Sequence, residues 1–312
     1  MSRLTNSGAL PKGWLAFELN ILSRLKFGSA ALPIAGDPAL GAYLKRWGVR
    51  VVSNDLLQSN WTRTFAFVQN NAETLTEEQA AVALYDAYVP RHRLYNPALK
   101  NWFNETDAWW FDNVRENIER LESPYARAIA LSIGMAVGDY VLSFTEQTLE
   151  LRQPLSQVFR RVLNTLQPPT NNNKNNACSN KDPKEFLAEI YADVLFLRLP
   201  RPHNSSIRAS LGWSAWREEW TRGTDSFWDA LEQTQAGRIG THTETKYQYL
   251  RLVEDLLQTA SHLNKWTIAH VEDGFITTEE LAETVTKVRR VDTIYTKDFS
   301  ELTGARAVIL TA

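Results

Sequence analysis

Two arginines follow an apolar run that reads as a buried strand. Residues 192–197 are Ala-Asp-Val-Leu-Phe-Leu, and Arg198, Leu199, Pro200 and Arg201 come directly after them. An α/β fold places its chemistry at the carboxyl end of such a strand. A guanidinium group donates hydrogen bonds and accepts none. The arginine side chains at this strand end are therefore suited to anionic groups and cannot accept a hydrogen bond from an amine.

Two interpretations of Arg198 and Arg201 stay open. Either they form a pair that binds phosphate, or they form salt bridges with acids such as Asp182. We favour the salt bridges. Any nucleic-acid binding is expected to be weak and salt-sensitive, because the whole chain is slightly acidic. The residues that would contact the nucleic acid are the arginines that cluster in this part of the chain, namely Arg198, Arg201, Arg208, Arg217 and Arg222. The neighbouring stripe of Trp213, Trp216 and Trp220 has helical spacing, which favours a buried core over a nucleic-acid surface.

A second strand end carries an acid. Residues 30–35 are short and apolar, Gly36-Asp37-Pro38 is a turn sequence, and residues 39–47 have helical periodicity. The β-branched residues 49–53 then lead into Asn54 and Asp55. A right-handed crossover makes the two strands parallel neighbours, so Asp55 is expected to face Gly36. An acid at this point binds ribose hydroxyls in α/β nucleotide sites.

The remaining pattern predicts an α/β fold interrupted by helices. Residues 60–166 are almost wholly helical in periodicity, with expected helices at 76–88, 105–121 and 124–144. The asparagine-rich residues 167–181 predict a flexible linker. A helix at 246–263, a strand at 265–271 and a terminal antiparallel pair follow. The expected units are thus residues 1–59, the helical insertion 60–166, the linker 167–181 and the second α/β part 182–312.

Composition excludes several classes of protein. The chain has 312 residues, 44% of them hydrophobic, and a formal net charge of -2. Its one cysteine and five histidines show no metal-ligand spacing, so we expect no metal. The apolar window 126–144 includes Arg127 and Asp139, which favours a buried helix over a membrane span. These features predict a cytoplasmic protein that holds no metal and does not enter a membrane.

Four stretches, in order, resemble the Dam-like class of adenine-specific DNA methyltransferases. Residues 33–41 are similar to the Pro-Phe-x-Gly-Ser-Gly loop of that class, and Asn54-Asp55 to its Asn-Asp pair. Residues 103–115 resemble the opening of a family helix. Residues 180–194 resemble the Asp-x-x-x-Phe-Leu helix and Ala-Asp-Val strand that precede the catalytic motif.

The resemblance implies a class I methyltransferase sheet, S-adenosylmethionine as the cofactor and DNA as a partner. It places the cofactor beside Pro33, Ile34, Gly36, Asp37, Asn54, Asp55 and Asp182. It aligns the family's catalytic Asp-Pro-Pro-Tyr motif with Arg198, Leu199, Pro200 and Arg201.

Departures from the family pattern concern its chemistry. Arg198 replaces the catalytic Asp, Arg201 replaces the aromatic residue, and Pro38 replaces a loop glycine. The glycine- and lysine-bearing motif near the amino terminus is reduced to Asn6-Ser7-Gly8 and Lys12. We therefore expect a divergent homologue that is catalytically impaired and binds DNA, a nucleotide or a protein partner. The alternative is an active S-adenosylmethionine-dependent adenine methyltransferase with an altered motif, in which the acceptor is one of Asp37, Asp182 and Asp193.

Overall fold

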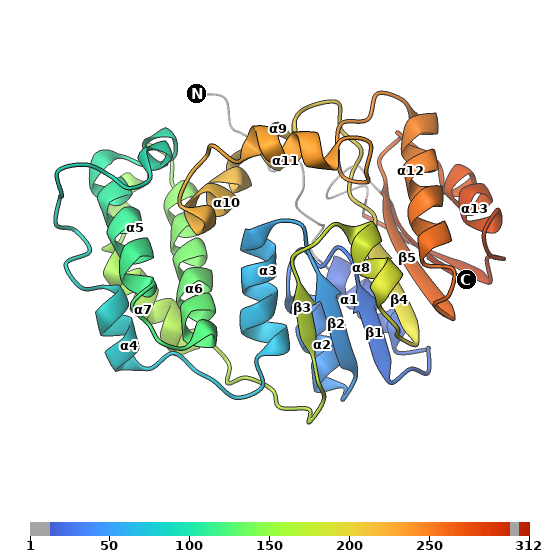
Figure 1. Cartoon of the computed structure of the whole chain (residues 1–312), viewed down its shortest axis with the longest axis horizontal. Coiled ribbons are helices and arrows are strands. Elements are labelled where there is room, and N and C mark those ends of the chain that lie inside the picture. Colours follow the sequence, from blue (N-terminus) through green and yellow to red (C-terminus); the bar gives the residue numbers. More distant parts are fainter. Residues whose placement is uncertain (1–12, 300–305) are drawn as a thin grey trace.

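A single mixed sheet organises the α/β part of the protein. The computed structural model describes residues 13–299 and 306–312, so the motif at Asn6–Gly8 and Lys12 lies outside the described residues. The sheet has seven strands in the order β3-β2-β1-β4-β5-β7-β6 (Figure 1). The strands are β1 (Ser29–Leu32), β2 (Arg50–Asn54), β3 (Ala177–Ser179), β4 (Val194–Arg198), β5 (Lys265–Glu272), β6 (Thr293–Asp298) and β7 (Arg306–Thr311).

Strand directions confirm the predicted fold class. The strands β3, β2, β1, β4 and β5 pair in parallel, and β7 is antiparallel to both β5 and β6. A mostly parallel sheet that ends in an antiparallel pair is the class I methyltransferase arrangement expected from the sequence. The carboxyl ends of β1, β2 and β4 therefore meet at one edge of the sheet, where ligands bind in open α/β folds.

Helices cover both faces of the sheet, so its central strands are buried on both sides. Along β4, Val194 and Phe196 pack with α1 (Trp14–Leu22) and α2 (Ala39–Arg46). The alternate residues Leu195 and Leu197 pack on the other face. That face is covered by α8 (Pro183–Glu189), α12 (Lys246–Thr259) and α13 (Thr278–Thr286).

The helical part stands beside the β3 edge of the sheet (Figure 1). From the α/β part, α3 (Gln58–Thr64) and the π-helix η1 (Phe65–Gln69) lead into it. It contains α4 (Glu77–Ala83), η2 (Pro97–Asn101), α5 (Glu105–Ile118), α6 (Pro124–Leu142), η3 (Leu149–Leu151) and α7 (Leu155–Thr165). The segment between β4 and α12 adds α9 (Ile207–Leu211), η4 (Gly212–Ser214), α10 (Ala215–Arg222) and α11 (Trp228–Gln235).

The helix α10 belongs to the core of this helical part. Its Trp216 and Trp220 are fully buried, which confirms the core interpretation of the tryptophan stripe. They pack on α6 where Gly138 and Gly134 leave room, since a Cβ at either glycine would lie 2.1 Å from a tryptophan ring atom. The helix α6 is long and apolar enough to cross a membrane by length and composition, and 67% of its apolar window is buried inside the protein.

The asparagine-rich stretch differs from the expected linker. Residues 177–179 form β3, the edge strand that pairs with β2. Asparagine side chains replace the apolar contacts that the stretch lacks: Asn172 Nδ2 donates to the Val49 carbonyl at 2.8 Å, and Asn176 Oδ1 accepts from Val51 N at 3.0 Å. The expectation of a flexible linker is therefore wrong for the residues that dock on β2.

The helix expected at residues 76–88 is also shorter, because α4 ends at Ala83. The side chain of Asn117 on α5 donates to the carbonyls of Ala83 and Tyr85, so it satisfies groups that a further turn of helix would have used. Residues 84–96 then run without regular helix or strand.

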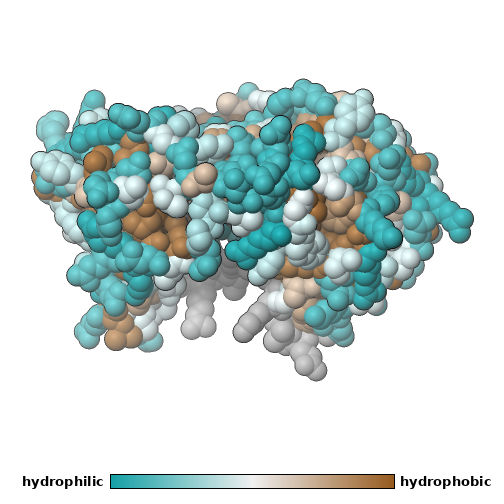
Figure 2. All heavy atoms as spheres, turned by 90° about the horizontal axis from the view of Figure 1, so that it is seen from below, coloured by the Kyte–Doolittle hydropathy of each residue, from teal (hydrophilic) through white to brown (hydrophobic). Residues whose placement is uncertain are grey.

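The surface of the helical part is partly hydrophobic. Figure 2, which shows the molecule from below, has hydrophobic side chains at the surface of its helical end.

Candidate functional site

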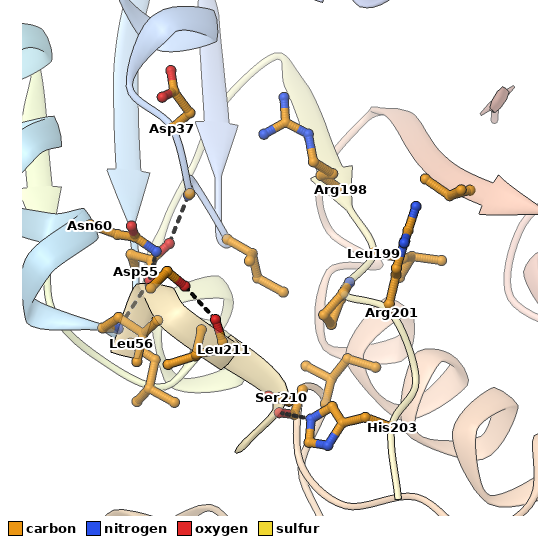
Figure 3. Close-up of a pocket in the computed structure, with 18 of the residues that line it drawn as sticks. Asp37, Asp55, Leu56, Asn60, Arg198, Leu199, Arg201, His203, Ser210 and Leu211 are labelled. Carbon is orange, nitrogen blue, oxygen red and sulfur yellow. Dashed lines mark hydrogen bonds between the residues drawn. The ribbon is translucent and has the colours of Figure 1, made fainter. Parts of the chain in front are cut away.

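A cleft of about 1010 Å³ opens at the carboxyl ends of β1, β2 and β4. In Figure 3, Asp37, Asp55 and Asn60 lie on one side of it, and Arg198, Leu199 and Arg201 lie on the other. Residues of the segment that leads from β4 to α10 complete the wall. The structure thus brings together most residues that the sequence placed at a site, but it also gives most of them partners within the protein.

Asp55 faces Gly36, as the crossover between β1 and β2 required. Its Oδ2 accepts a hydrogen bond from Gly36 N at 2.7 Å, and its Oδ1 accepts from Leu57 N at 3.0 Å and Asn60 Nδ2 at 3.2 Å. The side chain is buried, and this desolvation raises the pKa of Asp55 to about 6 in spite of these donors. The carboxylate therefore holds the β1 turn in place.

Asn54 is engaged in the same way. Its Nδ2 donates to the carbonyls of Pro33 and Lys181 at 3.0 and 2.9 Å, and its Oδ1 accepts from Lys181 N at 3.0 Å. The residue is 1% exposed and joins the end of β2 to both of its neighbouring segments. Its amide group is thus structural in this arrangement.

The turn after β1 forms the nearest part of the cleft wall. Gly36 has a φ of 58°, a left-handed conformation that favours glycine. Asp37 makes an ion pair with Arg63 of α3 at 2.8 Å and accepts from Ala39 N at 2.9 Å. Ile34 also lines the cleft.

Arg198 is locked in a buried ion pair with Glu18 of α1. Its Nε and Nη2 donate to the two Glu18 oxygens at 2.9 and 2.7 Å, and Trp14 Nε1 donates to Glu18 as well. The Glu18 side chain is fully buried. Arg198 Nη1 also lies 3.8 Å from the point that a Cβ on Gly36 would occupy, so the guanidinium stands against the turn.

The expected acid partner, Asp182, is elsewhere. Its side chain caps α8 by accepting from Lys184 N and Glu185 N, and it pairs with Arg238 at 3.2 Å. Its neighbour Pro183, and not Asp182, lines the cleft. The idea that Asp182 neutralises the arginines of the strand end is therefore wrong, although neutralisation itself is right for Arg198.

Leu199 and Pro200 are fixed by the elements around them. Leu199 N donates to the Ala269 carbonyl of β5 at 2.9 Å, which continues the sheet past the end of β4. Tyr249 of α12 donates its hydroxyl to the Pro200 carbonyl at 2.8 Å, and burial raises the pKa of that tyrosine. Arg201 lines the cleft beyond them.

Three further arginines of the proposed nucleic-acid set are also paired. Arg208 bonds to Glu219 at 2.7 Å, Arg217 to Asp139 at 2.7 Å and Arg222 to Glu218 at 2.7 Å. Glu218 and Glu219 are almost fully buried. The positive charges of these three arginines are therefore balanced by acids of the protein.

Sequence reasoning missed Glu18, Glu218 and Glu219. Glu218 accepts from Gln58 N and Ser59 N at 2.8 Å, so a side chain of α10 caps the start of α3. Glu219 accepts from the indoles of Trp102 and Trp228 at 2.6 and 2.9 Å. No local pattern marks these residues, because each role depends on a partner from a distant part of the chain.

Metal ligands are not gathered in this part of the molecule. Within residues 13–299 and 306–312, no group of three or more His, Cys, Asp or Glu side chains is arranged to hold a metal ion. Cys178 is a free thiol beside Ser53, and burial raises its pKa to about 11.

Comparison with known proteins gives one distant relative and no matching family model. The chain is 23% identical over 291 residues to the type II methyltransferase M2.HphI of Haemophilus parahaemolyticus. The similarity covers 83% of this chain and 81% of that protein. Its extent supports a methyltransferase ancestry for the whole fold, in agreement with the strand order.

Proposed function

We propose that this chain is a divergent homologue of the Dam-like adenine-specific DNA methyltransferases that no longer transfers a methyl group. It acts instead by binding DNA, a nucleotide or a protein partner in the cytoplasm. The ion pair between Arg198 and Glu18 carries this proposal, because it fixes a cation at the strand end where the family has its catalytic acid.

Methylation of adenine requires an acceptor at that point. The exocyclic amine is a weak nucleophile because its lone pair is delocalised into the ring, so the site must accept its hydrogen bonds and favour the positive charge that develops. Arg198 has only donors and opposes that charge. Replacement of the family's aromatic residue by Arg201 also removes a stacking contact worth about 1–3 kcal/mol.

The residues around Asp55 do not fit S-adenosylmethionine, the cofactor that similarity to a methyltransferase suggests. An acid at this strand end binds the two hydroxyls of a ribose, which needs free acceptor positions. The Asp55 carboxylate already uses three of its roughly four acceptor positions for Gly36, Leu57 and Asn60 and is 4% exposed, so it could bind both hydroxyls only if part of this network opened. We therefore assign no chemistry through this cofactor.

The alternative is an active enzyme in which Asp37, Asp182 or Asp193 is the acceptor, and the three acids lie in different places. Asp182 caps α8, and Asp193 bonds to Gly28 N and Ser29 N at the opposite end of β1 and β4. Only Asp37 of the three lines the cleft. Of these three acids Asp37 supports the alternative best, and it would act after release from Arg63.

Methyl transfer to adenine in duplex DNA tests the proposal directly. With tritiated cofactor and an active adenine methyltransferase as the parallel control, we expect no incorporation above background. Isothermal titration with S-adenosylmethionine and with its demethylated product should give no binding heat. Incorporation that the Asp37→Asn variant abolishes would overturn the proposal and establish the active-enzyme alternative.

A further inference from the structure

The irregular segment 84–96 is held in place by buried polar side chains of α5. Asp112 accepts from Tyr95 N and Asn96 N at 2.8 and 2.9 Å. Asn113 and Asn117, which are both 1% exposed, donate to five backbone carbonyls of this region. These carbonyls belong to Ala83, Tyr85, Asp86, Ala87 and Val89. Buried polar groups thus fix the shape of a surface segment.

The fixed segment displays aromatic rings to solvent. Tyr85 is 63% exposed, Tyr95 62%, and Tyr88 39%. The Tyr88 hydroxyl accepts from Leu155 N at 2.7 Å, which holds that ring in one place. A cavity of about 320 Å³ lies beside Tyr95, between α5 and α10. Exposed rings on a rigid backbone present flat apolar surfaces at low entropic cost.

The same segment carries cations that no acid neutralises. Arg91 and Arg93 make no ion pair with any residue of the described chain, and neither does Lys100, which follows the segment on η2. The guanidinium of Arg91 lies 5.2 Å from the centre of the Tyr95 ring, a cation–π contact that leaves its charge available. By contrast, four arginines near the cleft and α10 are paired with Glu18, Glu219, Asp139 and Glu218, namely Arg198, Arg208, Arg217 and Arg222.

We propose that the 84–96 segment binds single-stranded nucleic acid. Unpaired bases stack on exposed aromatic rings, whereas a duplex keeps its base faces covered, and free guanidinium groups bind the phosphates between the bases. An acidic protein surface would meet the charges equally well but would not need exposed rings on the same segment. The contacts are to base faces and phosphates, so binding tolerates many sequences.

This surface is separate from the cleft. Figure 1 shows α4 and α5 at the end of the molecule opposite to β4 and β5. The proposal therefore goes beyond the proposed function, and it stands or falls independently of methyl transfer. Variants that remove tyrosine rings from this surface do not change the residues at the carboxyl end of β4.

Fluorescence anisotropy of the full chain tests the proposal. The probes are labelled oligothymidine and oligouridine of about 20 nucleotides and a duplex of the same length. We expect saturable binding of single strands, at least tenfold tighter than of the duplex, with an affinity that falls as salt rises between about 50 and 200 mM. The DNA and RNA probes distinguish the two sources of a single strand.

Variants separate the contribution of the tyrosine rings to binding from that of the arginine charges. The double variant Tyr85→Leu and Tyr95→Leu keeps apolar area without ring faces, and we expect roughly a tenfold or greater loss of affinity. Tyr95→Phe should bind as the wild type does. Arg91→Gln with Arg93→Gln should weaken binding of all single strands and flatten the salt dependence by roughly 1.4 units of log–log slope, about 0.7 for each lost contact.

The matched control removes exposed arginines far from this surface. Arg251 on α12 and Arg290 after α13 are exposed and form no ion pair within the described chain. Arg251→Gln with Arg290→Gln should leave affinity unchanged. Absence of binding by the wild type, equal affinity for duplex and single strand, or equal losses in control and test variants would each overturn the proposal. Thermal unfolding of each variant verifies that it is folded.

Discussion

Two surfaces of this protein are rich in arginine, and they differ in what becomes of the charge. At the cleft, Arg198 is bonded to the buried Glu18, and Arg217 to Asp139. On the 84–96 segment, Arg91 and Arg93 meet no acid among the described residues. Arginine count in a sequence therefore does not predict cationic surface. The distant carboxylates decide whether a guanidinium stabilises the fold or stays available to a ligand.

The strongest test of this contrast is the Arg198→Ala variant. Removing one partner of a buried pair leaves an uncompensated charge, so we expect a loss of about 3–5 kcal/mol in the free energy of unfolding. Urea denaturation measures it. The matched control is Arg63→Ala, which breaks the more exposed pair with Asp37 and should cost less than about 1 kcal/mol. Equal, small losses would mean that Arg198 is a free cation after all.

Asp55 should make stability depend on pH. Its pKa is raised to about 6 in the folded protein, so the folded state binds the proton more tightly than the unfolded chain does. This contribution is complete below the unfolded pKa and is lost as pH rises through about 6. Between about pH 4 and pH 7 it amounts to at most about 3 kcal/mol.

The Asp55→Asn variant removes that titration. Its stability should fall less than that of the wild type over the same pH range, as measured by urea denaturation at both ends. A variant that keeps the wild-type pH dependence would show that Asp55 is not buried as a structural carboxyl. Asp55 would then again be a candidate ligand-binding group at the cleft.

The Gly134→Ala variant tests the packing of α10 on α6 that brings Arg217 to Asp139. The new Cβ would lie 2.1 Å from the Trp220 ring, so α10 must move away from α6. We expect a loss of about 1–3 kcal/mol in thermal or urea unfolding. Gly28→Ala serves as the control, because its Cβ would meet only an Asp193 oxygen at 3.5 Å. If Gly134→Ala left the free energy of unfolding unchanged, that result would contradict the close contact between Gly134 and the Trp220 ring.

The smallest effect is expected at the other surface. Arg91→Gln with Arg93→Gln removes two charges that support no ion pair, so the free energy of unfolding should change by less than about 0.5 kcal/mol. Differential scanning calorimetry of the variant and of the wild type measures this change in stability. A large destabilisation would reveal partners for these arginines and would remove the contrast between the two surfaces.

Local pattern predicted the framework of the sheet. The apolar run before Gly36, the β-branched run before Asn54 and the turn between them placed β1 and β2 as parallel neighbours, which the register of Ala31 with Val52 confirms. The start of α13 is likewise marked by a local pattern, the capping box of Thr277 and Glu280. Such features are encoded within a few residues of each other.

Other features depend on residues far apart in the sequence. Arg198 and Glu18 are 180 positions apart, and no periodicity connects them. The strand β3 has only three residues, and it is a strand because β2 supplies its hydrogen bonds. The end of α4 at Ala83 depends on Asn117, 34 residues later. The sequence therefore indicated where a site would lie and could not show which of its charges were already paired.

The position of β3 has a consequence for the folding pathway. The backbone N–H of Val51 on β2 donates to the side chain of Asn176, 125 residues later, and the helices α3 to α7 lie between them. Closing such a loop is slow while the intervening chain is unfolded, and it becomes easier once that chain has collapsed into helices. We therefore expect the helical part to form first and the sheet edge to close late. In refolding experiments followed by hydrogen exchange, the amides of residues 177–179 should be among the last to gain protection.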